Sequence, residues 1–141
     1  MESLFLTDKT KELLPRIQSF VENELYPLET TEYLSGKFSK VEPILKEKRA
    51  LVKKMGMWGL QHHLTLCEFG QVSEVLAMSP FGHYVFNCQA PDIGNMELLE
   101  RFASESLKSN YLEPLKNVVT KRRHCQYLTD LPKFAEGQMV L

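Results

Sequence analysis

The sequence lacks most of the features that mark exported, membrane and metal-binding proteins. Its three cysteines, Cys67, Cys88 and Cys125, are far apart and form no CxxC pair, so neither a zinc site nor a redox dithiol is indicated. An odd number of widely spaced cysteines is typical of reduced thiols in an intracellular protein. No apolar run approaches the roughly twenty residues of a membrane span, and the first residues resemble neither a signal peptide nor a transit peptide. The sequence therefore predicts no membrane span and no targeting signal.

An excess of charge of one sign is also missing. The formal net charge is -1 at pH 7, which is too small to steer a polyanion to the chain, so nucleic acid is not expected as a partner. The one basic run, Lys121, Arg122, Arg123 and His124, is short, and such runs are usually solvated surface. Hydrophobic residues make up 43% and charged residues 25% of the 141 residues, an ordinary composition that predicts a folded chain with one core.

Catalytic motifs are absent as well. The sequence contains no GxGxxG, GxxxxGK(S/T) or GxSxG motif. His62 and His63 are adjacent and point in different directions, whereas helical metal sites need histidines three or four residues apart. His83 has no acid spaced to orient it, which favours a hydrogen-bonded structural histidine. Cys88 has no basic neighbour to lower its pKa, which favours packing or pocket lining over a nucleophile. These residues predict no catalytic residue and no metal site.

What the sequence does contain is helical periodicity. Apolar residues recur at steps of three and four, and no strict two-residue alternation precedes the last residues, so the pattern predicts an all-α helical bundle. Thr7 is expected to cap a first helix that ends near Tyr26 and Pro27. Pro15 either kinks this helix or lies in the first turn of a helix that begins near Leu14.

Further helices are expected along the chain. After a loop through residues 35–37, Pro43 in a first-turn position opens a second helix, and Gly56 closes it as a C-cap. Thr65 and Glu68 have the spacing of a capping box at the start of a third helix.

The pattern changes towards the end of the chain. Residues 87–95 hold a proline and a glycine and are expected to be irregular, with Asn95 capping the helix that follows and Ser104 capping the next. Residues 118–141 give one weak apolar run and scattered turn residues. We therefore expect a helical domain over residues 1–117 and a poorly anchored, divergent tail over residues 118–141.

Several segments resemble the acyl-CoA dehydrogenase family. The strongest are VFNCQAPDIGNMELL, residues 85–99, and FASESLKSNYLEPL, residues 102–115. FVENELYPLE, MGMWGL and FGQVSEVLAMSP support them in the family's order, so that the resemblance covers about residues 7–115. It is closest to the subgroup whose animal members include proteins with an added phosphotransferase-like domain.

The resemblance implies a three-part enzyme with an amino-terminal helical domain, a middle β domain and a carboxy-terminal helical bundle. Such enzymes of fatty acid metabolism bind FAD and desaturate an acyl-CoA thioester, with a glutamate base taking the α proton and the flavin taking the β hydride. In this chain the family's catalytic glutamate and its threonine-glutamate-proline flavin segment have no counterpart. We therefore expect a truncated family member, with no catalytic residue, no assignable flavin-binding residue and no FAD bound by this chain alone.

The resemblance also implies where the acyl chain lies. In the family, the loop and helix that correspond to residues 86–96 lie along the acyl chain near the flavin. The positions expected to line that pocket are Phe86, Cys88, Ala90, Pro91, Asn95 and Met96. Their small or apolar character suits a dry wall, since each buried methylene is worth about 0.8 kcal/mol. The other interpretation is that these residues form the core of the helical domain.

Partners and compartment follow from the same resemblance. The family acts on acyl-CoA, and mitochondria or peroxisomes are the compartments it implies. A domain that normally packs on two others has an apolar interface, so we expect self-association or a protein partner. A second function therefore stays open, that of a non-catalytic helical interaction protein derived from this domain.

Overall fold

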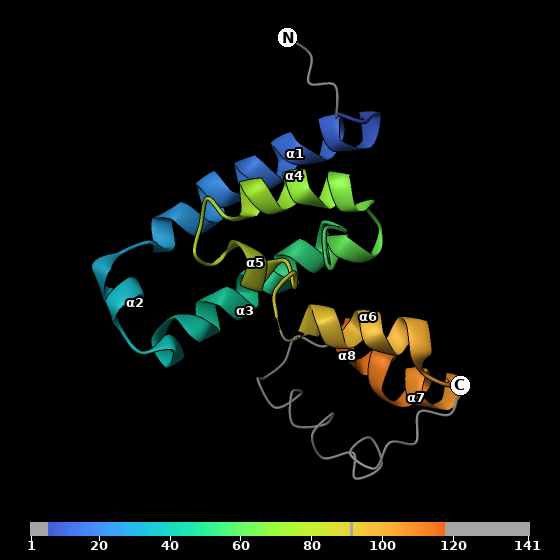
Figure 1. Ribbon diagram of the computed structural model, residues 1–141. Helices are drawn as coiled ribbons and strands as arrows, with labels where there is room; N and C mark the ends of the chain where they lie inside the picture. The colour runs from blue at the N-terminus through green and yellow to red at the C-terminus, as the bar shows by residue number, and fades with distance from the viewer. Residues whose placement is uncertain (1–5, 91, 118–141) are drawn as a thin grey trace. The chain divides into compact units, whose positions relative to one another are not determined.

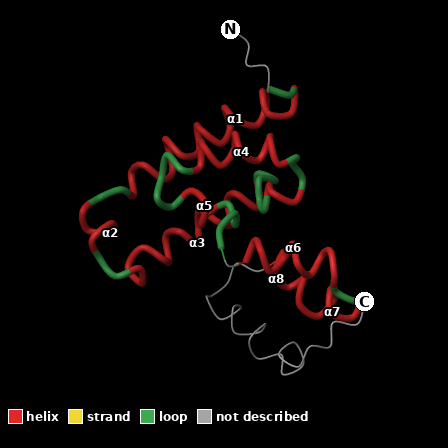
Figure 2. Tube along the Cα trace, in the orientation of Figure 1, coloured by secondary structure: helices red, strands yellow, loops and turns green. Residues whose placement is uncertain are grey.

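The computed structural model describes residues 6–90 and 92–117 of the chain, apart from the side chains of residues 31 and 32. They belong to two units, Met1–Gln89 and Ala90–Leu141. Every regular element of the described residues is a helix or a helical turn (Figures 1 and 2), which confirms the predicted all-α fold. The predicted tail and its basic run lie outside the described residues.

Helix α1, Asp8–Phe20, begins where the sequence predicted a cap. The hydroxyl of Thr7 accepts a hydrogen bond from the backbone N–H of Thr10 at 3.3 Å, and the Thr10 hydroxyl accepts one from the N–H of Thr7 at 3.0 Å. Two N–H groups that the helix itself cannot bond are thereby satisfied. The prediction of a Thr7 cap is confirmed.

Pro15 lies inside α1, so the alternative in which the helix begins near Leu14 is wrong. The cap at Thr7 fixes an earlier start. Proline has no N–H for the carbonyl of Lys11, but both residues are exposed, so water can bond that carbonyl instead.

Two helical turns extend α1 beyond Phe20. The first is a π-helical turn, Val21–Leu25, and the second is a short 3₁₀ turn, Tyr26–Leu28. The helical segment therefore ends beside Pro27, close to where the sequence predicted. Helix α2, Thr31–Ser35, then adds one short helix in the stretch that was expected to lead into a loop.

Helix α3, Phe38–Lys54, begins five residues before Pro43, so the prediction that Pro43 opens this helix is wrong. The residues before the proline explain the difference. Val41 is buried in the core, and the ring of Phe38 packs edge-on against Tyr84 with centroids 5.4 Å apart. Apolar burial thus extends the helix through an exposed proline.

Gly56 ends α3, as the sequence predicted. Its φ is +71°, a left-handed conformation that glycine adopts without strain. Its N–H bonds the carbonyl of Lys53 at 3.0 Å, and the N–H of Met57 bonds that of Val52 at 3.1 Å. This pair of bonds is a Schellman motif, and the side chains of Met57 and Val52 are both buried behind it.

Three further elements complete the first unit: a 3₁₀ turn, Leu60–His62, helix α4, Leu66–Leu76, and the short helix α5, Gly82–Val85. Helix α4 lies along α1 and runs in the same direction (Figure 1). The predicted capping box is confirmed, because Thr65 and Glu68 exchange hydrogen bonds at the start of α4.

The carboxylate of Glu68 joins the starts of both helices. One oxygen accepts hydrogen bonds from the N–H of Thr65 at 2.9 Å and from its hydroxyl at 3.0 Å. The other accepts from the hydroxyl of Thr7, the cap of α1, at 2.8 Å. The N–H of Thr65, first, and then the two hydroxyls lower the pKa of Glu68. Its negative charge also lies near two positive helix ends.

We expect Glu68→Gln to destabilise the protein at pH 7 and to do so less at pH 3. Because the folded-state pKa of Glu68 is lowered, its stabilising effect is present above the ordinary pKa of 4.5 and is lost as the pH falls through the folded-state value. Thermal melts at both pH values measure the difference. Glu12→Gln, at an exposed position of α1, is the control, and an equal loss at both pH values would contradict the assignment.

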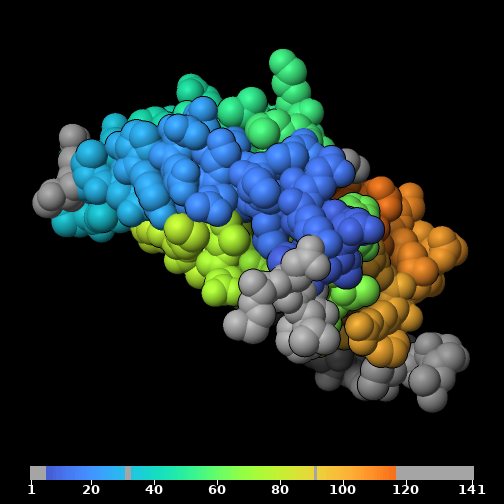
Figure 3. Space-filling model, turned by 90° about the horizontal axis from the view of Figure 1, so that it is seen from above, coloured from blue at the N-terminus to red at the C-terminus, as the bar shows by residue number. Residues whose placement is uncertain are grey.

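One core unites the elements of the first unit. Figure 3 shows the side of this unit that α1 covers. Helices α1, α3, α4 and α5, the turns Val21–Leu25 and Leu60–His62, and the loops between them contribute buried apolar residues. They are Ile17, Phe20, Val21, Leu25, Val41, Leu45, Val52, Met57, Leu60, Val72, Leu76, Phe81, Val85, Phe86 and Cys88.

The second unit is smaller. Helix α6, Asp92–Phe102, is followed along the chain by the short helix α7, Glu105–Leu107. It packs against the π-helical turn Lys108–Leu112 and helix α8, Glu113–Asn117. Its buried apolar residues are Met96, Leu99, Leu112 and Leu115.

Of the two helix caps predicted in this unit, the one at Ser104 is confirmed and the one at Asn95 is wrong. Ser104 caps α7 as expected, since its hydroxyl accepts from the N–H of Leu107 at 3.4 Å. Asn95 caps nothing, because α6 already begins at Asp92, and the irregular stretch predicted through residue 95 is shorter than expected. An aspartate in the first turn favours this earlier start, because it faces the positive end of the helix dipole.

Candidate functional site

The six residues expected to line an acyl pocket fall in both units. Phe86 and Cys88 belong to the first unit, whereas Ala90, Asn95 and Met96 belong to the second. Pro91 lies outside the described residues. The lining role stays a prediction for all six.

Phe86 and Cys88 are both part of the core of the first unit. Phe86 has no exposed surface, and its ring packs edge-on against Phe20 with centroids 5.3 Å apart. The thiol of Cys88 donates to Oε1 of Gln61 at 3.0 Å. Burial raises the pKa of this thiol to about 11, so it is protonated at neutral pH and is a poor nucleophile. In this unit both residues pack as core side chains do.

Asn87, between these two residues, adopts an unusual backbone conformation. It has a φ of 58°, and it is the one non-glycine residue with positive φ among residues 6–90 and 92–117. Asparagine tolerates the left-handed region better than most residues. The N–H of Gly59 bonds the carbonyl of Phe86 at 2.9 Å, and Nε2 of Gln61 bonds the carbonyl of Asn87 at 3.3 Å. The segment that contains Gly59 and Gln61 therefore fixes this turn.

In the second unit, Asn95 and Met96 lie on α6. Met96 is fully buried in the small core, and Ala90 is exposed at the start of the unit. The nitrogen Nδ2 of Asn95 is buried and has no hydrogen-bond acceptor among the described residues. A buried unmet donor costs about 1–3 kcal/mol, so this nitrogen is suited to bond an acceptor on a ligand or on another part of a protein.

The three histidines that the structure describes differ from one another in their surroundings. Nε2 of His83 lies 2.8 Å from the hydroxyl of Ser73, which confirms the predicted hydrogen-bonded histidine, and burial lowers the pKa of its ring. His62 is half-buried in a 3₁₀ turn and His63 is exposed after it, so the two do not share a site. Within the described ranges, no three His, Cys, Asp or Glu side chains are grouped to hold a metal ion.

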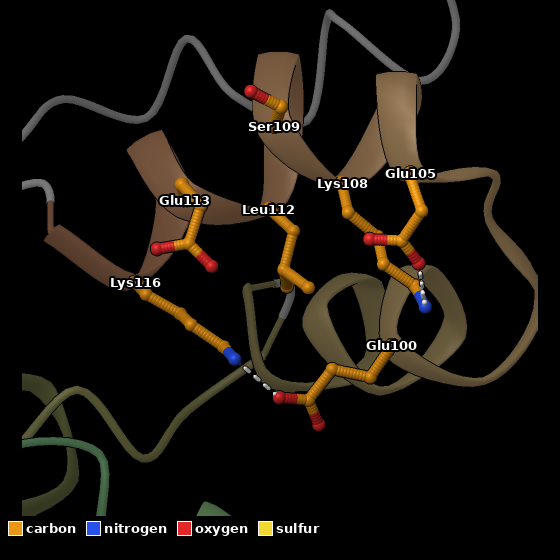
Figure 4. Close-up of a pocket in the computed structure, with 7 residues that line it drawn as sticks. All are labelled: Glu100, Glu105, Lys108, Ser109, Leu112, Glu113 and Lys116. Atoms are coloured by element: carbon orange, nitrogen blue, oxygen red, sulfur yellow. Dashed lines mark hydrogen bonds and ion pairs between the residues drawn. The ribbon is translucent and has the colours of Figure 1, made fainter.

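A cavity of about 370 Å³ opens on the second unit (Figure 4). Two ion pairs cross or border it, Lys116 with Glu100 at 2.6 Å and Lys108 with Glu105 at 3.0 Å. None of the five predicted residues that the structure describes lines it, and a wall of charges does not suit an acyl tail. Its lining is Glu100, Glu105, Lys108, Ser109, Leu112, Glu113 and Lys116.

Known proteins of similar sequence and structure share one family name. None of the known protein-family profiles matches the chain. Acyl-CoA dehydrogenase family member 10 of Mus musculus is 30% identical over 125 residues, 78% of this chain, and family member 11 of Gallus gallus is 31% identical over 125 residues, 81% of this chain. The solved structure of a proposed acyl-CoA dehydrogenase from Mycobacterium abscessus matches 78% of this chain with a TM-score of 0.68 and 30% identity.

The chain belongs to the acyl-CoA dehydrogenase family. It spans only a small part of its relatives, namely 12% of the mouse protein, 16% of the chicken protein and 32% of the Mycobacterium abscessus chain. The shared part is all-α here, as the family's amino-terminal helical domain was expected to be. Among the described residues of this family member, no helix has the length and apolar character that crossing a membrane requires.

Sequence analysis missed one group of residues in this family member. Arg49 lies four residues after Leu45 and three before Val52, and both of these are core residues of α3. A charged residue on the apolar face of a helix is a detectable signal, because a buried charge needs specific partners.

Proposed function

We propose that this chain provides the amino-terminal helical domain of an FAD-dependent acyl-CoA dehydrogenase fold, and that it does not desaturate acyl-CoA by itself. The observation that carries the proposal is the family match, which takes in most of this chain but a minor part of each relative. Within such an enzyme, residues 86–96 would form one wall of the acyl site. The buried, unmet Nδ2 of Asn95 supports this role, since it is a donor suited to a polar acceptor there.

The cavity of the second unit does not fit FAD well. Its lining holds three carboxylates, Glu100, Glu105 and Glu113, against two lysines that pair with Glu105 and Glu100, and an excess of carboxylates repels the diphosphate of the cofactor. Reduction of a flavin also requires a base for the substrate's α proton, and the sequence has no counterpart of the family's glutamate. The helices of this chain would therefore shape and dry the acyl site, while other parts of an enzyme supply the chemistry.

We expect the purified chain to be colourless and to bind FAD no tighter than millimolar, about −4 kcal/mol. We also expect no desaturation of octanoyl-CoA when FAD and an electron-accepting dye are added. Visible absorbance after gel filtration measures bound flavin, and bleaching of the dye measures turnover. A yellow protein with stoichiometric flavin, or turnover above the rate without protein, contradicts the proposal.

A second candidate function is that of a non-catalytic helical interaction protein. Leu98 and Phe102 of α6 favour it, because they lie four residues apart on one helix face and are 46% and 75% exposed. Large exposed apolar side chains that cluster in this way mark contact surfaces.

Sedimentation velocity separates this second candidate from a domain without a partner. If α6 mediates self-association, the apparent mass rises with concentration, and Leu98→Ser with Phe102→Ser lowers the association constant about tenfold or more. The control pair, Glu97→Gln and Arg101→Gln, alters neighbouring positions of α6 that carry charge instead. A chain that remains monomeric at high concentration contradicts self-association.

A further inference from the structure

Arg49 of α3 is a charged residue within the core of the first unit. Its side chain is 5% exposed. The central carbon of its guanidinium lies over the ring of Trp58, 4.6 Å from the centroid, and over the ring of Tyr84, 4.5 Å from the centroid. Cation–π attraction of this kind is strongest where water is excluded, so both rings help to hold the charge in the core.

The same guanidinium bonds both ends of the turn from Tyr84 to Asn87, with which α5 ends. Nη1 donates to the carbonyl of Tyr84, and Nη2 donates to Oδ1 of Asn87 at 3.2 Å. Arginine offers these donors in one rigid plane, which lysine cannot do. Asn87 is the residue with φ of 58°, a conformation that costs free energy unless the surroundings enforce it. Arg49 therefore bonds the turn at its left-handed residue.

Cys88 follows directly after this turn and is 4% exposed. Its N–H bonds the carbonyl of His83 at 2.9 Å, so its burial depends on the same turn. The boundary of the first unit comes one residue later, after Gln89. The turn therefore lies at the end of the first unit.

We propose that Arg49 is a positioning residue that holds the left-handed turn at Asn87 closed and thereby keeps Phe86 and Cys88 in place. This role of Arg49 rests on the proposed function in one respect only, because Phe86 and Cys88, the two residues that the turn holds in place, are proposed to be part of the acyl wall. The closed turn itself is measurable without flavin or acyl-CoA.

The test measures how fast a thiol reagent, DTNB, reacts with Cys88 in the full chain. Cys67→Ser and Cys125→Ser leave Cys88 as the one thiol, since the sequence has three cysteines. Arg49→Met is expected to raise the reaction rate about ten- to a hundredfold, because it removes buried hydrogen bonds from a charged donor. The control Arg16→Met removes an exposed arginine that bonds the carbonyl of Met55, and the rate stays within about threefold.

A rescue variant separates positioning from general packing. Glycine adopts positive φ without strain, so adding Asn87→Gly to Arg49→Met is expected to lower the rate again towards the parent value. A merely structural role of Arg49 predicts no such rescue, because glycine adds no contacts. If the double variant reacts as fast as Arg49→Met alone, the proposal is wrong.

Circular dichroism shows whether Arg49→Met remains folded. If it unfolds, Asn87→Val in the parent takes its place, since a β-branched residue disfavours positive φ. This variant is expected to keep its helicity and to react about tenfold faster, whereas an unchanged rate would contradict the proposal. Turnover of acyl-CoA by the chain would contradict the proposed function and leave these rates unaffected.

Discussion

Gly82→Ala is expected to destabilise the first unit by about 3 kcal/mol. A Cβ at this position would lie 2.1 Å from the carbonyl oxygen of Leu76 and 2.9 Å from its carbonyl carbon. Both atoms belong to the backbone at the end of α4, so no flexible side chain can move aside. The loop between α4 and α5 would have to shift, and Phe81 and Val85 of the core would shift with it. Urea unfolding measures the change in free energy.

Gly70→Ala is the matched control for this substitution. Gly70 lies inside α4, is exposed, and has open space around the position of a Cβ. Alanine there is expected to stabilise the helix by about 0.5–1 kcal/mol, because glycine loses more backbone entropy on folding. If both alanine variants change the free energy of unfolding alike, the close approach at Gly82 is not real.

Phe86→Ala is expected to cost about 3–5 kcal/mol, the range for truncating a buried aromatic residue. Phe86 has no exposed surface and packs on Phe20, so the variant leaves a cavity in the core of the first unit. The control is Leu66→Ala in the same unit, where the side chain is 88% exposed and the expected change is within about 0.5 kcal/mol. A cost below 1 kcal/mol for Phe86→Ala would mean that this ring is not a core residue.

Much of the fold was predictable from local signals. The caps at Thr7, Thr65 and Ser104 and the C-cap at Gly56 each depend on a side chain or φ value that one or two nearby residues determine. Helical periodicity identified the longer helices but not the short helix α2. Such signals involve residues that are close together in the sequence, so they can be recognised without the structure.

The prolines were less predictable. Pro15 and Pro43 both lie inside helices, although proline usually ends one. What decides their place is tertiary packing. Core residues of the same helix, Ile17 in α1 and Val41 and Leu45 in α3, stabilise each helix despite its proline.

The candidate site was predictable only in part. The resemblance identified residues 86–96, but the sequence could not show that Phe86 belongs to one core and Met96 to another. It also could not show that Arg49 bonds Asn87, 38 residues away. Long-range pairs of this kind depend on how the helices pack, which no local pattern encodes.

Hydrogen exchange of the segment from Gly82 to Cys88 tests the central claim most directly. That claim is that the chain forms a folded helical domain which binds neither FAD nor acyl-CoA by itself. The amides of this segment are bonded within the unit, for example Phe86 N–H to the carbonyl of Gly82 at 3.1 Å. The account predicts that this segment is strongly protected in the free chain and that FAD with octanoyl-CoA leaves its exchange unchanged. Exchange at the unfolded rate, or a clear rise in protection when FAD and octanoyl-CoA are added together, would contradict it.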